Sequence, residues 1–146
     1  MHPKAGWSTP MLHVRDVAAS IRFYERLGFQ FIDAEGDDGS IGWARVHCEG
    51  GAIMFLCAED EHAVKPAEQG ILLYLYTEDL VALREHLIAQ GIECPAIQFP
   101  EYMPSGELTI RDPDGYCIVI GHWGQKEHDA WLQQIPARQA KWAKRG

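Results

Sequence analysis

The sequence contains few basic residues and lacks the short motifs of several large enzyme classes. It has 13 Lys and Arg against 21 Asp and Glu, a formal net charge of −8, and a field of this sign repels phosphate backbones and anionic lipids. It contains no G-x-G-x-x-G, G-x-x-x-x-G-K-[ST], H-E-x-x-H or G-x-S-x-G motif, so nucleotide cradles, zincin proteases and nucleophile elbows have no basis in it. We therefore expect neither nucleic acid nor a membrane as a partner.

Paired cysteines and long apolar runs are also absent. Cys48, Cys57, Cys94 and Cys117 lie far apart and form no C-x-x-C pair, which gives zinc-ribbon and thioredoxin-like sites no support. Nowhere do 18 apolar residues follow one another, and the first residues contain no apolar stretch of signal-peptide length. We therefore expect a cytoplasmic protein whose cysteines are small, mostly buried apolar residues.

The composition is otherwise that of an ordinary globular domain. The chain has 146 residues, of which 47% are hydrophobic and 23% charged, and a chain of this length buries enough surface to be stable without disulfide or metal. We expect a single domain over residues 1–146. The charge is uneven, at −11 over residues 1–125 and +3 over residues 126–146. Such an acidic body favours a cationic ligand, and it equally keeps a protein soluble.

One pattern occurs twice, at a shift of 63 residues. Segments 11–28 and 74–91 each read as a strand, an Asp, an amphipathic helix and a Gly. The helices are predicted over residues 17–27 and 80–90. Asp caps the free amides at a helix start, and Gly adopts the left-handed conformation that ends a helix. The residues in these roles are Asp16 and Asp79 at the helix starts, and Gly28 and Gly91 at the ends.

Strand-like runs follow each predicted helix, so each half reads βαβββ. The sequence therefore predicts an α+β fold of two modules, over residues 8–57 and 71–123, joined by a polar linker at 58–70. A helical extension follows at 124–146, where Pro136 kinks or splits the helix. The predicted strands after the helices are 29–34, 41–48 and 52–57 in the first module, and 93–99, 107–111 and 116–123 in the second.

Two motifs connect this arrangement to a known superfamily. The run Leu12–Phe29 (LHVRDVAASIRFYERLGF) and the closing run Gly106–Tyr116 (GELTIRDPDGY) resemble the vicinal oxygen chelate superfamily over residues 9–123. That superfamily includes glyoxalase I, the extradiol dioxygenases, the fosfomycin-resistance enzymes and the bleomycin-resistance proteins. The resemblance implies that each module curls into an incomplete barrel and that the modules pair to form a cup where a ligand binds.

The resemblance also implies four metal-ligand positions, which enzymes of the superfamily fill with His or Glu. The first position of each half lies seven residues before the capping Asp, which gives Thr9 and Leu72. The second lies four residues after the turn glycine, Gly51 or Gly115, which gives Phe55 and Val119. Divalent cations need nitrogen, oxygen or thiolate donors, and none of the four is a usual ligand. We therefore expect no metal and no other cofactor.

This chain is thus closest in character to the metal-free bleomycin-resistance branch. The leading hypothesis is a glyoxalase-like small-molecule binding protein of the antibiotic-resistance type. On this hypothesis the protein sequesters a small aromatic molecule, and the acidic body would favour a cationic one. The resemblance also implies a homodimer. Strand alternation places His13 on one face with Thr9, and Tyr74 and Tyr76 on one face with Leu72. The residues expected to line the cup are His13, Phe55, Tyr74, Tyr76, Tyr102 and Val119.

An enzyme of the same superfamily is the alternative. A lyase or dioxygenase could use relocated metal ligands at His13, His47 and Glu107, and a metal-free acid/base catalyst could use His13 or Glu107. A purely structural protein, with side chains filling the cup, is a third hypothesis. Neither the ligand nor the occurrence of catalysis follows from the sequence.

Overall fold

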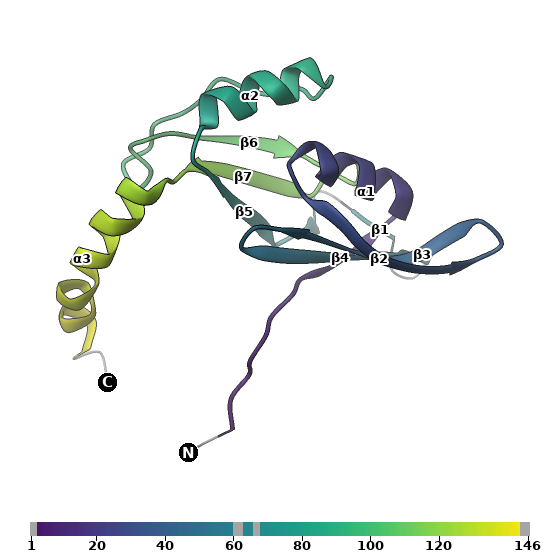
Figure 1. Cartoon of the computed structure of the whole chain (residues 1–146), viewed down its shortest axis with the longest axis horizontal. Helices are drawn as coiled ribbons and strands as arrows, with labels where there is room; N and C mark the ends of the chain where they lie inside the picture. Colours follow the sequence, from purple (N-terminus) through teal and green to yellow (C-terminus); the bar gives the residue numbers. More distant parts are fainter. Residues whose placement is uncertain (1–2, 60–62, 66–67, 144–146) are drawn as a thin grey trace. The chain divides into compact units, whose positions relative to one another are not determined.

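A computed structural model describes residues 3–59, 63–65 and 68–143 (Figure 1). The fold is α+β, as predicted, and the described strands form two sheets. The chain divides into two compact units. Unit 1 comprises Met1–Leu72 and Arg111–Cys117, and unit 2 comprises Leu73–Ile110 and Ile118–Gly146. Part of the predicted linker 58–70 lies outside the described residues.

Unit 1 contains a sheet of strand order β1-β4-β3-β2. β1 pairs with β4 in parallel, and the other neighbouring strands pair antiparallel. The turn between β2 and β3 places Asp38 at φ 44° and Gly39 at φ 78°, which is the positive-φ pair that a tight type I′ hairpin requires. The bounds are β1 Met11–Val14, β2 Gln30–Asp37, β3 Ser40–Cys48 and β4 Gly51–Cys57.

Helix α1 (Val17–Arg26) packs on β2, β3 and β4. The Asp16 carboxylate accepts a hydrogen bond from the Ala19 amide at 3.1 Å, and Gly28 has φ 94°. The predicted cap and stop signals of this helix are therefore confirmed. Its buried face meets one side of the sheet, and the core of this region includes Leu12, Val14, Val17, Ile21, Tyr24, Ala44, Val46, Ile53 and Phe55.

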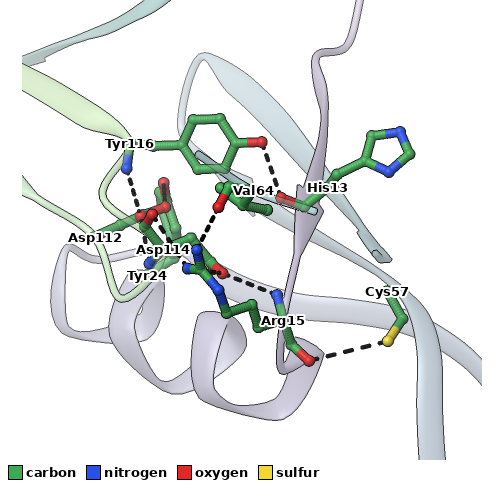
Figure 2. A network of polar contacts seen from close by, with 8 residues as sticks. All are labelled: His13, Arg15, Tyr24, Cys57, Val64, Asp112, Asp114 and Tyr116. Carbon is green, nitrogen blue, oxygen red and sulfur yellow. Dashed lines mark hydrogen bonds and ion pairs between the residues drawn. The ribbon is translucent and has the colours of Figure 1, made fainter. Parts of the chain in front are cut away.

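A buried carboxylate ties the turn at residues 112–115 to helix α1 (Figure 2). Asp112 accepts hydrogen bonds from the Tyr24 hydroxyl and from the backbone amides of Asp114 and Tyr116, each at 2.9 Å. Burial raises the pKa of Asp112 above the usual Asp range, and burial together with this carboxylate raises the pKa of Tyr24. The Arg15 amide also donates to Asp114 Oδ1 at 2.8 Å, so the turn is held both by α1 and by the residue that follows β1.

Unit 2 contains most of a second sheet, of order β5-β7-β6, with β5 at Leu72–Thr77, β6 at Glu107–Arg111 and β7 at Cys117–His122. Helix α2 (Leu80–Ala89) again follows its predicted signals. The Asp79 carboxylate accepts from the Ala82 amide at 3.0 Å, and Gly91 has φ 81°. The buried apolar residues of unit 2 include Leu73, Leu80, Leu87, Ile92, Leu108, Ile110, Ile118 and Ile120.

The predicted strand at 93–99 does not form. This segment makes one isolated bridge, in which Gln98 pairs with Glu107. Pro95 has no amide hydrogen for a ladder, and its carbonyl instead accepts from Arg84 Nε at 2.7 Å. Tertiary contacts of α2 therefore replace the strand pairing that the repeat predicted.

The C-terminal helix α3 spans Gln125–Trp142 and continues through Pro136 without splitting. The last residues of the predicted extension, 144–146, lie outside the described residues. No side chain of α3 is buried. No helix in the described part of the chain combines the length and apolar content needed to cross a bilayer.

The prediction of mostly buried cysteines is wrong. All four cysteines are free, as expected, but Cys57 is exposed and Cys48, Cys94 and Cys117 are partly exposed. Cys48 and Cys57 are the last residues of their strands, where the covering helix no longer shields them.

Candidate functional site

The candidate site lies on the face of the unit 2 sheet that carries Tyr74 and Tyr76. Along β5 the side chains alternate, so Leu73 is buried while Tyr76 is 60% exposed. On β7, a Cβ at Gly121 would lie 3.2 Å from Tyr74 Cε1. Val119 stands two residues before Gly121 and therefore shares its face. The structure thus brings Tyr74, Tyr76 and Val119 to one face of the sheet.

A single carboxylate organises this face. Glu107, at the start of β6, is only 9% exposed. Its Oε1 accepts a hydrogen bond from the Tyr102 hydroxyl at 2.5 Å, and its Oε2 accepts one from the Tyr74 hydroxyl. Within the described residues, no Lys, Arg or His forms an ion pair with Glu107. The two phenols are therefore the groups that stabilise this nearly buried charge.

Both phenols hold their protons at neutral pH. Burial and the hydrogen bond to Glu107 raise the pKa of Tyr74, and the hydrogen bond to Glu107 raises the pKa of Tyr102. A phenol normally ionises near pH 10, so a higher pKa keeps both hydroxyls protonated throughout the physiological range. Each phenol therefore acts as the donor in its contact with Glu107.

A row of aromatic rings leads from this carboxylate to α3. Ring centroids lie 5.3 Å apart between Tyr74 and Tyr76, 6.0 Å between Tyr76 and Trp123, and 6.3 Å between Trp123 and Trp131. These separations are those of interacting aromatic pairs. Sequence reasoning did not predict Trp123 and Trp131 as site residues. Trp123 follows the last strand directly and Trp131 lies in the second turn of α3, and this closeness to the sheet could have indicated a place at the site.

Beside this row lies an open hollow of about 520 Å³, a size within the range of small-molecule sites. The 100–105 loop forms one wall and α3 forms another. The exposed rings of Tyr76 and Tyr102 and the indole of Trp131 offer flat apolar surface to it. The lining residues are Tyr76, Glu101, Tyr102, Met103, Pro104, Ser105, His122, Trp123, Glu127, Ala130, Trp131, Gln134 and Arg138.

Glu127 holds the start of α3 against the loop. Its Oε2 accepts from the Gly124 amide at 2.9 Å, and its Oε1 accepts from the Ser105 hydroxyl at 3.3 Å and lies 3.7 Å from His122 Nε2. Hydrogen bonds from the backbone amides of Glu127 and Gly124 lower the pKa of this carboxyl. The anionic side chain thus joins the two walls of the hollow.

Acidification is expected to weaken the Glu127 contacts. Because the folded pKa of Glu127 lies below its unfolded value, its stabilising contribution is complete above the usual Glu pKa, near 4.3, and is lost as the pH falls through the lowered value. A Glu127→Gln variant should respond less to acid than the parent does. Circular dichroism of the helical signal between pH 6 and pH 3 measures this, and identical acid responses of the two proteins would contradict it.

Phe55 is a core residue of unit 1. Its side chain is fully buried, and its ring centroid lies 5.1 Å from that of Tyr24 on α1. In the sheet it pairs with Leu12 and Ala44, which are buried as well. Phe55 therefore packs against the helix and offers no surface to a ligand in this structure.

His13 lies in unit 1 beside a different hollow, of about 280 Å³, together with Tyr116 and Lys65. Tyr116 donates its hydroxyl proton to the His13 carbonyl at 2.9 Å, and Figure 2 shows the imidazole turned away from that contact. The structure thus gathers Tyr74, Tyr76, Tyr102 and Val119 within unit 2 and places His13 and Phe55 in unit 1.

The four positions that the superfamily uses for metal do not fit a divalent cation. Leu72 and Val119 have aliphatic side chains, and Phe55 is enclosed in the core. Thr9, the remaining position, accepts a hydrogen bond from Arg45 Nη2 at 3.4 Å. This set lacks the carboxylate, imidazole or thiolate donors that hold such ions.

The relocated ligand set is not assembled in the described residues either. Among these residues, no three His, Cys, Asp or Glu side chains gather as a possible metal group. His13 and His47 belong to unit 1, and Glu107 belongs to unit 2. The His47 Nε2 atom accepts a hydrogen bond from Arg45 Nε at 2.7 Å, which occupies one of its two ligand positions.

Comparison of the sequence with protein families agrees with this fold and its repeat. The profile of the Glyoxalase/Bleomycin resistance protein/Dioxygenase superfamily matches residues 8–120. The chain therefore belongs to that superfamily, which confirms the resemblance seen in the two motifs. Among curated proteins, no sequence matches this chain significantly. Helix α3 begins beyond the matched residues.

Solved structures share the fold at low sequence identity. A bleomycin-binding protein crystallised with bleomycin is 21% identical, with a TM-score of 0.65 and coverage of 82% of this chain and 100% of that one. The antibiotic-binding protein TnmS3 from Streptomyces sp. CB03234 is 17% identical, with a TM-score of 0.65 and coverage of 83% and 98%. The fosfomycin resistance protein FosX from Listeria monocytogenes, complexed with Mn(II) and dihydroxypropylphosphonic acid, is 15% identical, with a TM-score of 0.61 and coverage of 86% and 95%.

Proposed function

We propose that this protein binds and sequesters a small aromatic molecule without a metal cofactor, in the hollow that Tyr76, Tyr102, Trp123 and Trp131 help to line. The observation that carries the proposal is the open hollow of about 520 Å³ beside the aromatic row. We further propose that it acts in the cytoplasm as a homodimer.

The exposure of the rings supports a ligand. Tyr76, Tyr102 and Trp131 are 60%, 71% and 40% exposed and all line the hollow. Grouped exposed apolar side chains around a concavity are typical of ligand sites, since leaving them in water is unfavourable. A flat aromatic molecule would cover these rings and stack on them.

The comparisons support the same class of function. The bleomycin-binding protein and TnmS3 are named for binding antibiotics, and both have the fold of this chain. The four positions of this chain that lack metal donors support binding over metal-dependent chemistry. A role in antibiotic resistance by sequestration follows as the corresponding biological proposal.

Binding should be saturable and independent of metal. A thermal-shift screen of aromatic compounds, with calorimetric titration of the hits, is expected to give the same affinity with and without a chelator. Trp131→Ala should weaken binding at least several-fold because it removes one wall of the hollow, while the unfolding midpoint stays close to the parental value since Trp131 is partly exposed. Trp7→Ala is the matched control, because Trp7 is 97% exposed and lies outside the hollow.

Two results would contradict the proposal. The first is metal analysis that finds close to one Zn, Ni, Mn or Fe per chain after dialysis, together with binding that a chelator abolishes. The second is conversion of a bound compound to product, followed by mass spectrometry, with loss of turnover in Glu107→Gln or His13→Gln. The latter result would establish the metal-free acid/base enzyme instead.

A further inference from the structure

Helix α3 carries an apolar stripe that the hollow does not use. Trp131 and Arg138 lie on the side of α3 that lines the hollow. Leu132, Ile135 and Trp142 follow one another at steps of three and seven residues, which brings them to one stripe beside that side. None of these three residues lines the hollow. The stripe is therefore left over after the proposed binding site has been accounted for.

The apolar stripe stays exposed within the described part of the chain. Leu132 and Trp142 are each 49% exposed, and no residue of α3 is buried. Figure 1 shows α3 leaving the unit 2 sheet after β7 and running away from it. A lone helix of about this length is only marginally stable in water, and Pro136 removes one of its backbone hydrogen bonds. An apolar surface packed against the stripe would stabilise the helix.

Strand β2 offers a surface of the matching kind. It is the last strand in the order β1-β4-β3-β2, and seven of its eight residues are exposed. Phe31 and Ile32, both on this strand, are each 47% exposed. Proteins protect such a sheet edge from unwanted pairing by covering it, for example with a helix. A helix of 18 residues is about 27 Å long and a strand of eight residues about 26 Å, so α3 can lie along the whole strand.

The charges of the two elements are complementary. Residues 30–38 contain four acidic and no basic residues, and residues 130–146 contain four basic and no acidic residues. The acidic residues are Asp33, Glu35, Asp37 and Asp38, and the basic residues are Arg138, Lys141, Lys144 and Arg145. Opposite charges on two surfaces speed their encounter and disfavour other partners. Charge and apolar surface therefore match α3 to β2.

We infer that α3 of one copy docks along β2 of a second copy of this chain, with its apolar stripe on Phe31 and Ile32. The inference rests on the proposed function, because it names the contact that forms the proposed homodimer. A second copy is the fitting partner, since it carries both surfaces and a symmetric pair of copies makes the contact twice. The helix involved begins beyond the residues that the superfamily profile matches, so the contact belongs to this chain's own extension.

The size of the contact supports this reciprocal arrangement. One side of α3, about 27 Å long and about 10 Å wide, covers about 270 Å². Counted on both partners, two such contacts bury about 1,100 Å², which exceeds the roughly 1,000 Å² that a specific interface needs. A single contact buries only about half of that area. Two copies that exchange their helices therefore form a more stable pair than one docked helix does.

Charge reversal on each surface tests the contact. Asp33→Lys with Glu35→Lys reverses the strand, and Gln139→Glu with Lys141→Glu reverses the helix; all four side chains are exposed, so both variants should fold. The parent protein is expected to be a dimer at low micromolar concentration in sedimentation equilibrium. Each reversed pair should weaken the dimer at least about tenfold because like charges then face each other. The variant that combines both pairs should recover most of the affinity.

A matched control separates the contact from net charge. Glu85→Lys with Glu93→Lys changes exposed residues on and after α2, and it makes the chain less acidic by the same amount as the strand pair does. The control should not weaken the dimer, because lower net charge reduces repulsion between two acidic copies. Equal weakening by the control and the strand pair would overturn the inference. Failure of the combined variant to recover would overturn it as well.

The apolar part of the contact has its own test. Leu132→Gln should weaken the dimer by about tenfold, since it places a polar group against apolar side chains. Ile88→Gln is the control, because Ile88 is 46% exposed on α2, and it should leave the dimer unchanged. Equal dimer affinity in Leu132→Gln and the parent would contradict the docking of the stripe. Circular dichroism and unfolding midpoints establish that every variant is folded.

The remaining outcomes distinguish this inference from the proposed function. A dimer that neither charge reversal weakens would overturn the contact of α3 with β2, while the proposed homodimer stands. A parent protein that remains monomeric would overturn both the homodimer and the contact. Binding of an aromatic compound is measured separately by calorimetric titration, so a failure of sequestration is told apart from a failure of this contact.

Discussion

Replacement of Phe55 by alanine is expected to lower the free energy of unfolding by about 3–5 kcal/mol, the usual cost of removing a large aromatic side chain from a core. Phe55 is fully buried, and it packs on the Tyr24 ring between the sheet of unit 1 and α1. The missing ring leaves a cavity that the close-packed neighbours fill only in part. Urea unfolding followed by circular dichroism measures the effect.

The same substitution decides between two roles for this position. Phe55→Leu keeps most of the volume and should cost much less than alanine, with little change in the binding of any aromatic probe to folded protein. A stable Phe55→Ala variant that has lost binding would show that Phe55 lines the ligand site and would contradict the packing described above.

Replacement of Asp112 by alanine is expected to be the second large effect, at about 3 kcal/mol or more. The Asp112 carboxylate accepts hydrogen bonds from the Tyr24 hydroxyl and from the amides of Asp114 and Tyr116. Each donor left unsatisfied in a buried place costs about 1–3 kcal/mol. Asp112→Asn keeps an acceptor oxygen for the two amides and should lose clearly less. Equal losses in the two variants would contradict the assigned hydrogen bonds.

The difference in stability between the parent protein and Asp112→Asn should change with pH in one direction. Burial raises the folded pKa of Asp112 above its unfolded value. The cost of burying the charge is therefore fully present above the folded pKa, and it is relieved as the pH falls from there toward the ordinary Asp value near 4. Relative to Asp112→Asn, which cannot titrate, the parent protein should gain stability over that interval. Unfolding titrations between pH 7 and pH 4 compare the two proteins.

Local signals were the most predictable part of the structure. The capping roles of Asp16 and Asp79 and the left-handed conformations of Gly28 and Gly91 depend on a few adjacent residues, so sequence alone contains them. Strand alternation in β5 is equally local, and it correctly placed Tyr74 and Tyr76 on one face. Asp16 and Gly28 belong to the first of the two motifs by which the superfamily was identified.

Features that depend on distant residues were less predictable. The strand expected at 93–99 does not form, and the sequence held one signal against it, since Pro95 has no amide hydrogen for a ladder. The contact of Arg84 with the Pro95 carbonyl is not visible from sequence spacing. Counting from Gly51 located Phe55 on its strand, but it did not show which face of that strand α1 would cover. The sequence placed Glu107 and Tyr102 near each other, whereas their meeting with Tyr74 from another strand required the fold.

The compact unit that contains the first half of the chain also includes a segment of the second half, Arg111–Cys117. The two sequence repeats suggest a gene duplication, in which the first half once stood alone. Yet the turn that holds Tyr24 and Arg15, at Asp112 and Asp114, comes from the second half of the chain. A fragment that stops at Leu72 would lack that turn and leave the buried Tyr24 hydroxyl without its acceptor. The first half standing alone would therefore have needed a different acceptor for that hydroxyl.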